Sequence, residues 1–214
     1  MSKLLKIQTP KFIDELDEGM SFSESINEYD KVQNYVIEND FIEDMDTTAL
    51  TIDSCIFKNT VFSNCTFKNI SLFDTIFENC DLSNIDFTCG GIHRVEFINC
   101  KLLGSKFDET SLKDVLFKNS MSKYSSFSFS KLKSIIIDNC NLEEATFQEV
   151  KLDKMCLNNT NLSNSFFNKT SLNKIDLTTC DITGINAEIP DISGITVTSM
   201  QALELTRLLN INVR

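Results

Sequence analysis

Large apolar residues recur every five positions along most of the chain. Counting in fives from Ile52 to Ile182 gives 27 positions, and all of them except Ser122 hold Leu, Ile or Phe. An α-helix repeats its apolar face every 3.6 residues and a β-strand every two, so neither element explains this spacing. The pattern predicts instead that each five-residue repeat forms one short side of a larger coil.

A second column of the repeat lies two residues before each large residue. Its positions hold small or β-branched residues, except Leu50 and Met155. Large residues alternating with small ones fill a narrow interior without voids. Asn recurs two places after the large residue, and because Asn tolerates turn conformations, these positions predict corners. Like residues also recur every twenty positions, so four repeats should complete one coil. The clearest series is Phe67, Phe87, Phe107, Phe127, Phe147 and Phe167.

This pattern resembles the pentapeptide-repeat family, whose motif is A(D/N)LXX with a central Leu or Phe. The resemblance implies an all-β fold, a right-handed quadrilateral parallel β-helix with the large and small columns pointing inward. We expect three regions, an acidic N-terminal capping segment over 1–50, the repeat β-helix over 51–198, and a C-terminal helix with its tail over 199–214. Because Phe12 and Phe22 keep the register while other positions of 1–50 lose it, partial coils are one reading of that segment.

The last residues predict a short amphipathic helix. Thr198 and Gln201 have the spacing of a capping box, and Asn210 is expected to end the helix. Its leucines either cover the last coil or form the seam of a homodimer, because one coil can bury only some of them. The residues expected at the dimer seam are Leu203, Leu205, Leu208, Leu209 and Ile211.

A repeat body followed by a Leu-rich helix and an apolar tail resembles the Qnr and MfpA group of this family. That resemblance implies an end-to-end dimeric rod that binds DNA gyrase or topoisomerase IV through a DNA-like negative surface. The expected function is therefore non-enzymatic protection of a type II topoisomerase from quinolones or a peptide toxin. The alternative is a structural or scaffolding protein with an unrelated protein partner.

Charge limits these functions further. The chain has 31 acidic and 20 basic residues, a net charge of −11, which excludes a protein that grips nucleic acid phosphates directly. Residues 1–50 hold twelve acids and four Lys, a net of −8, so the remaining residues carry only −3. An acidic segment is often just a solvated terminus, so mimicry of DNA requires local acids in the repeats. The acids expected to contact the partner are Asp108, Glu109, Glu143, Glu144 and Glu149.

Reactive residue types are scarce. His93 is the single His, placed at an outward position, and the chain has no Cys-x-x-Cys pair, so we expect no catalytic residue, metal site or cofactor. Six of the eight Cys fall in the small inward column, which leaves Cys89 and Cys156 as the exposed thiols. The chain has neither the apolar stretch of a signal peptide nor one long enough to span a bilayer, so a cytoplasmic protein without membrane contact is expected.

Two places interrupt the pattern. The first is the stretch 119–126, where Ser122 stands in place of the large apolar residue of every other repeat, which suggests a kink, a bulge or a contact surface. Gly90 and Gly91 form the second irregular point, where Gly permits an unusual backbone; a tight corner in one coil is the simpler explanation.

Overall fold

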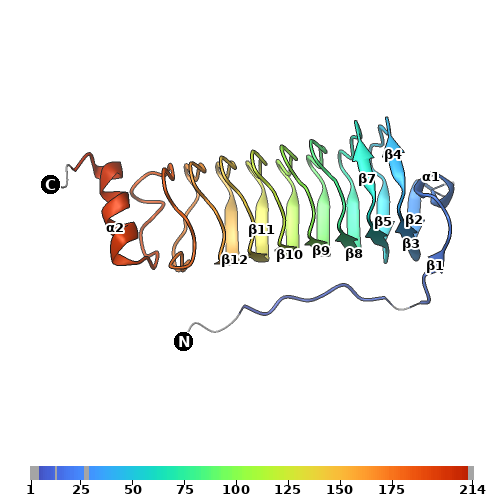
Figure 1. Ribbon diagram of the computed structural model, residues 1–214, viewed down its shortest axis with the longest axis horizontal. Helices are drawn as coiled ribbons and strands as arrows, with labels where there is room; N and C mark the ends of the chain where they lie inside the picture. Colours follow the sequence, from blue (N-terminus) through green and yellow to red (C-terminus); the bar gives the residue numbers. More distant parts are fainter. Residues whose placement is uncertain (1–4, 13, 27–28, 212–214) are drawn as a thin grey trace.

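The computed structural model describes residues 5–12, 14–26 and 29–211 and shows a straight parallel β-helix of about seven coils (Figure 1). Each coil contains twenty residues, because Leu72 pairs with Ile92 and Ile92 with Leu112 in the next coils. The predicted four-sided coil is therefore confirmed. We name the sides by their central residues in one coil, side 1 at Leu72, side 2 at Phe77, side 3 at Leu82 and side 4 at Phe87, and apply the names at twenty-residue intervals.

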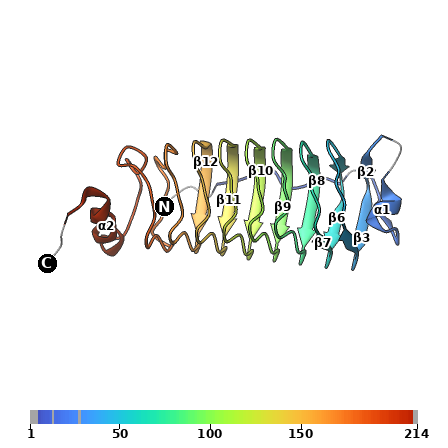
Figure 2. The same cartoon turned by 90° about the horizontal axis from the view of Figure 1, so that it is seen from above.

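Short strands and three helical segments make up the elements of the described part of the chain. They are β1 (Asp17–Glu18), α1 (Phe22–Ser25), β2 (Lys31–Gln33), β3 (Tyr35–Glu38), β4 (Phe41–Glu43), β5 (Thr51–Asp53), β6 (Ile56–Lys58), β7 (Val61–Ser63), β8 (Ser71–Glu78), β9 (Gly91–Ile98), β10 (Ser111–Lys118), β11 (Lys131–Asp138), β12 (Lys151–Asn158), α2 (Ser199–Leu205) and the 3₁₀ helix η1 (Thr206–Leu209). Sides 1 and 2 together form one parallel sheet, in which β8 to β12 lie side by side (Figure 2).

The interior is filled by the two predicted columns. Of the 27 large positions, only Leu152 is half-buried; the others, including Ser122, are buried. Phenylalanine rings stack from coil to coil at the twenty-residue period, with the Phe127 and Phe147 centroids 4.9 Å apart and those of Phe147 and Phe167 4.7 Å apart. Offset stacking of rings adds to the burial of apolar area, so this ladder stabilises the contact between successive coils.

The corner residues at five-residue intervals from 54 to 174 all have left-handed backbone. Residues two places after the large residue have φ near +55°, as at Asn59 (φ 50°) and Asn79 (φ 56°). Asn adopts this conformation more readily than most residues. At the corner between sides 2 and 3 each Asn amide also donates to the amide oxygen one coil earlier, for example Asn139 to Asn119 at 2.9 Å. The Asn positions read as corners in the sequence are confirmed as corners.

The N-terminal end of the coil is closed by α1. Phe22 is fully buried, and its ring lies 5.6 Å from that of Phe57. The first strands in coil register are β2 to β4, so the coil extends to residue 31, inside the segment that we assigned to the cap. Phe12 keeps the five-residue register in the sequence but does not enter the coil; it is half-buried on a segment outside it.

Both interruptions of the pattern lie in regular coil. Ser122 is 2% exposed, and its amide donates to the carbonyl of Asn141 at 2.7 Å, so the backbone has neither a kink nor a bulge there. Neither Gly90 nor Gly91 has a left-handed φ. A Cβ at Gly90 would come 2.9 Å from the carbonyl oxygen of Phe87 and 3.1 Å from the side chain of Ile70, so close backbone together with a large neighbour in the previous coil explains this glycine.

The sheet of sides 1 and 2 ends at β12. No backbone hydrogen bond joins β12 to the next coil over residues 171–178, although sides 3 and 4 continue through the bridges of Asn161 to Asp181 and Phe166 to Asn186. Met155 occupies the small inward column in β12 and is half-buried. The break therefore coincides with a side chain that is too large for its column.

Candidate functional site

The five acids expected to contact a partner lie close together. Asp108 is on side 4, Glu144 is at the corner between sides 3 and 4, and Glu109 and Glu149 are at the corner between sides 4 and 1. Glu143 lies at the adjoining end of side 3. The structure therefore brings all five onto side 4 and its borders, within three successive coils.

Lysines neutralise part of this acidic group. Lys123 Nζ lies 3.0 Å from Glu143 and 3.7 Å from Glu144, and Lys169 lies 2.9 Å from Glu149. Asp108 accepts hydrogen bonds from the Ser126 hydroxyl and the Ser128 amide. Among the described residues no group forms a hydrogen bond or ion pair with the exposed Glu109 carboxylate. The field of this surface is therefore weaker than five acids alone would produce.

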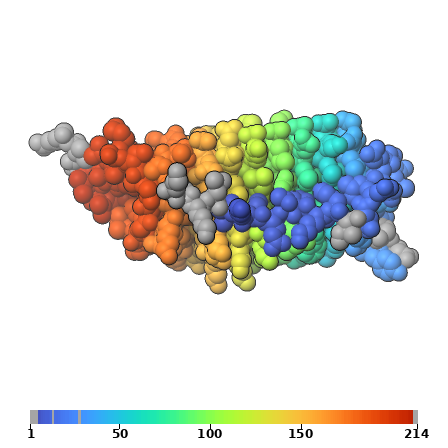
Figure 3. All heavy atoms as spheres, turned by 90° about the horizontal axis from the view of Figure 1, so that it is seen from below, coloured from blue at the N-terminus to red at the C-terminus, as the bar shows by residue number. Residues whose placement is uncertain are grey.

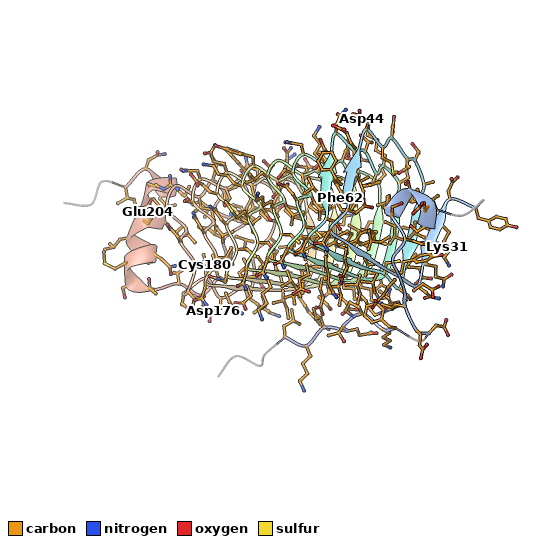
Figure 4. All side chains as sticks on the ribbon, turned by 45° about the vertical axis from the view of Figure 1, so that its right-hand side comes forward. Lys31, Asp44, Phe62, Asp176, Cys180 and Glu204 are labelled. Atoms are coloured by element: carbon orange, nitrogen blue, oxygen red, sulfur yellow. The ribbon has the colours of Figure 1, made fainter. Side chains whose placement is uncertain are left out.

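Acidic side chains are denser at the N-terminal end. Glu18, Glu38 and Asp40 border a shallow hollow of about 330 Å³ there, and Glu43 and Asp44 lie on the neighbouring side. Figure 4 shows Asp44 at the outer edge of the coil at this end, with Glu204 on the helix at the opposite end. The two ends of the rod thus differ in charge.

The C-terminal helix divides its leucines between two directions. Leu205 is buried and Leu208 half-buried against the last coil, and Gln201 donates to the carbonyl oxygens of Leu177 and Cys180, both at 2.8 Å. The predicted capping box of Thr198 and Gln201 is present. Leu203, Leu209 and Ile211 remain about half exposed. Leu205 and Leu208 therefore act as a cap, and only the outward three are free to meet a second copy.

The N-terminal segment follows a path that the sequence did not reveal. Residues 5–12 and 14–16, which we call the strap, run outside the coil along the corner between sides 1 and 2 (Figure 3). An extended chain advances about 10 Å in three residues, and two coils are also about 10 Å apart, so every third strap residue meets every second coil. The bonds join Gln8 to Asp114, Lys11 to Asp74 and Asp14 to Asn34.

A polar cluster on the coil receives the strap. Asp74 and Asp114 are 7% and 5% exposed, and Arg94 pairs with Asp74 through two nitrogens. Burial alone raises the pKa of Asp74, but the hydrogen bonds from Arg94 and the Lys11 amide lower it on balance. His93 Nε2 lies 3.6 Å from Asp114. Burial, with the charges of Arg94 and Lys113, lowers the His93 pKa, so this ring is mostly neutral at pH 7. His93 thus belongs to a docking cluster.

Six cysteines occupy the small inward column and are buried, while Cys89 is exposed and Cys156 half-buried. Burial raises the pKa of the Cys55 thiol to about 11, and the same cause raises that of Cys140 to about 11. Thiols in this state are poor nucleophiles. Within the described residues, no cluster of three or more metal-binding side chains is present, and none of the helices has the length and apolar character needed to cross a bilayer.

The sequence analysis singled out neither of two exposed aromatic residues, although one of them, Tyr124, lies in the stretch 119–126 that it named as irregular. Tyr124 and Phe129 are 55% and 50% exposed and stand at the two corners that border side 4. The signal was their place in the repeat, since both occupy the position where Asn recurs. Ser122 breaks the pattern at a buried position, whereas Tyr124 and Phe129 break it at exposed positions.

Comparison with known proteins agrees with this geometry. The model of the pentapeptide repeat region matches residues 70–147. Over residues 70–147 the chain therefore matches this repeat in sequence, and its coil has the fold of a pentapeptide-repeat β-helix. A second family model, the SV2A/B/C luminal domain, matches residues 23–107. No curated protein has a significant match to the chain.

Several solved pentapeptide-repeat structures are similar. A trypsin-treated variant of QnrB1, a plasmid-mediated fluoroquinolone resistance protein, is 20% identical, with 84% of this chain and 98% of that chain covered and a TM-score of 0.47. HetL of Nostoc sp. strain PCC 7120, involved in regulating heterocyst differentiation, is 15% identical, with 79% of this chain and 93% of HetL covered and a TM-score of 0.43. A pentapeptide repeat protein of the Arabidopsis thaliana thylakoid lumen is 22% identical, with 46% of this chain and 66% of that chain covered and a TM-score of 0.33. At these identities the likeness concerns the coil and not the function.

Proposed function

We propose that this pentapeptide-repeat β-helix is a non-enzymatic binding protein that occupies the DNA-binding surface of DNA gyrase or topoisomerase IV. Bound there, it protects the enzyme from quinolones or a peptide toxin. The observation that carries the proposal is a rigid rod with acids concentrated at one end and on side 4, and with an unpaired apolar helix face at the other end.

The rod supplies shape and charge, and the proposed function needs little else. Carboxylates on a rigid surface take the places of phosphates opposite Arg and Lys of the topoisomerase, and opposite charges also speed the encounter. Because the stacked coils fix the acids before binding, little entropy is lost in ordering them. Protection is then stoichiometric, with one rod per occupied site and no turnover.

Two copies joined through α2 complete the proposed particle. Leu203, Leu209 and Ile211 point away from the coil, and Met200 beside them is 75% exposed. The double variant Leu203→Glu, Leu209→Glu should be monomeric by light scattering while the coil keeps its melting temperature, because neither residue is part of the cap. The control Met20→Glu changes an exposed Met at the opposite end and should leave the mass unchanged. A monomeric wild type, or a dimeric double variant, contradicts the seam.

The test of the function is a supercoiling assay with purified DNA gyrase, run with and without ciprofloxacin. Added protein at a stoichiometric excess should restore supercoiling in the presence of the drug. The monomeric variant, assayed in parallel, shows whether protection needs two copies. Neither rescue nor inhibition, together with no binding to gyrase or topoisomerase IV, would overturn the proposal.

A scaffolding role is the second candidate, and one observation favours it. Side 1 and its corner with side 2 carry lysines that form no ion pair with a described acid, so part of the rod is basic and unlike DNA. They are Lys113, Lys131, Lys151, Lys154 and Lys174. A scaffold should bind an unrelated partner and leave supercoiling unaffected.

A further inference from the structure

One coil of the rod exposes far more apolar surface than its neighbours. Met121 on side 3 is 49% exposed, and Tyr124 and Phe129 project from the two corners of side 4 in the same coil. Between them the outward side chains of side 4 are Ser126 and Ser128, which are small. The two rings therefore protrude into solvent on either side of a strip of small polar side chains.

The coil itself gains little from these rings. Tyr124 and Phe129 have φ angles of 62° and 61°, in the left-handed region that costs a bulky residue conformational energy. Asn or Gly would relieve that cost, as Gly104 does one coil earlier and Asn84 two coils earlier in the Tyr124 column. Rings that are half exposed also recover only part of the free energy of burial. Exposed aromatics at a backbone cost are typical of interfaces, where Tyr and Phe form the centre of the contact.

The surroundings indicate the chemistry of the partner. Lys123 Nζ lies 4.7 Å from the centre of the Tyr124 ring and also pairs with Glu143, so a cation here contacts a ring and a carboxylate together. Phe129 stands in the same column as Glu109, one coil earlier, and Glu149, one coil later. A second cation brought by a partner would find the same combination of ring and carboxylate there.

We propose that Met121, Tyr124 and Phe129, with Asp108 and Glu109 beside them, are the surface through which the rod contacts its partner. The occupant is a basic protein surface that ordinarily holds DNA phosphates, and its Arg side chains stack on the rings and pair with the carboxylates. This inference rests on the proposed function and adds the contact surface to it. It assigns the specificity to the rings, because lysines neutralise three of the acids.

The experiment measures binding of the full-length protein to immobilised DNA gyrase and topoisomerase IV by biolayer interferometry. The variant Tyr124→Asn, Phe129→Asn places the residue preferred at corners in both columns. It should weaken binding by at least about tenfold, and its melting temperature should be equal to or above that of the wild type. Phe41→Thr, which removes a 60% exposed ring on β4 away from this surface, should bind like the wild type. Glu109→Gln should mainly slow association and reduce its dependence on salt.

The outcomes separate this inference from the proposed function. If the wild type and the Tyr124→Asn, Phe129→Asn variant bind with equal affinity, the contact surface is overturned and the proposed function is unaffected. A wild type that binds neither enzyme would overturn the function and this assignment with it. If self-association of the rod disappears only in the Tyr124→Asn, Phe129→Asn variant, the two rings contact a second copy of the chain, which also overturns the inference.

Discussion

The corner between sides 1 and 2 and the surface around side 4 are built from the same repeat, yet they treat their irregular residues differently. At the first, Asp74 and Asp114 replace the usual Asn and are buried beneath a strap whose backbone amides donate to both, and the half-buried Arg94 pairs with Asp74. At the second, Tyr124 and Phe129 replace Asn and remain open. A corner residue whose side chain finds hydrogen-bond partners within the chain stabilises the fold, whereas one that stays exposed is available to a binding partner.

The largest expected effect lies under the strap. Asp74→Ala removes the two-nitrogen pairing with Arg94 and the acceptor of the Lys11 amide, and should lower the free energy of unfolding by about 2–3 kcal/mol. Urea unfolding measures the loss, and faster hydrogen exchange at the Lys11 amide locates it. The control Asp53→Ala breaks the more exposed pair with Lys31 and should cost less than about 1 kcal/mol. Equal losses in both variants would show that the strap contributes nothing.

A smaller effect of opposite sign on the free energy of unfolding is expected beside the exposed surface around side 4. Ser122→Leu restores the large residue between Leu102 and Leu142 and should raise the stability by about 1–2 kcal/mol, because about 0.8 kcal/mol accompanies each buried methylene. Thermal unfolding of this variant, with the conservative Ser122→Thr as control, measures the gain. Destabilisation would mean that neighbouring side chains already fill the space.

The smallest effect concerns pH and is confined to the cluster under the strap. The lowered pKa of His93 means that the unfolded chain takes up its proton more readily, so stability should fall as pH drops below the ordinary value of 6.5. The loss should stay under about 1 kcal/mol and disappear in His93→Gln. Asp74 acts in a separate window, since its pKa lies below 3.8 and its contribution is lost only in stronger acid. A His93→Gln variant with an unchanged pH profile would contradict this assignment.

Local repetition explains how much of the fold the sequence revealed. The five-residue and twenty-residue periods determine the coil, because each repeat contacts copies of itself at fixed separation. The capping box at Thr198 was visible for a similar reason, being a motif of four residues. Ser21 and Glu24 have the same spacing and begin α1; there the signal was present and was not read.

What the sequence did not reveal depends on contacts without a fixed separation. The strap bond from Gln8 to Asp114 spans 106 residues, and nothing in the repeat marks its partner. The division of the α2 leucines likewise required the orientation of the helix on the last coil. Met155 was visible as an exception to its column, but its link to the end of the sheet needed the backbone bonds. The five acids were selected one by one, and only the coil shows that they share a surface.

The strap changes how such a rod comes apart. In a stack where each repeat touches only its neighbours, coils can fray one at a time from either end. A segment that lies across several coils at once couples their opening, because none of the coils that it bonds can separate without releasing it. The first half of the molecule should therefore unfold as one cooperative block, while the coils beyond β12, outside the reach of the described strap bonds and past the break in the sheet, are the place where fraying begins.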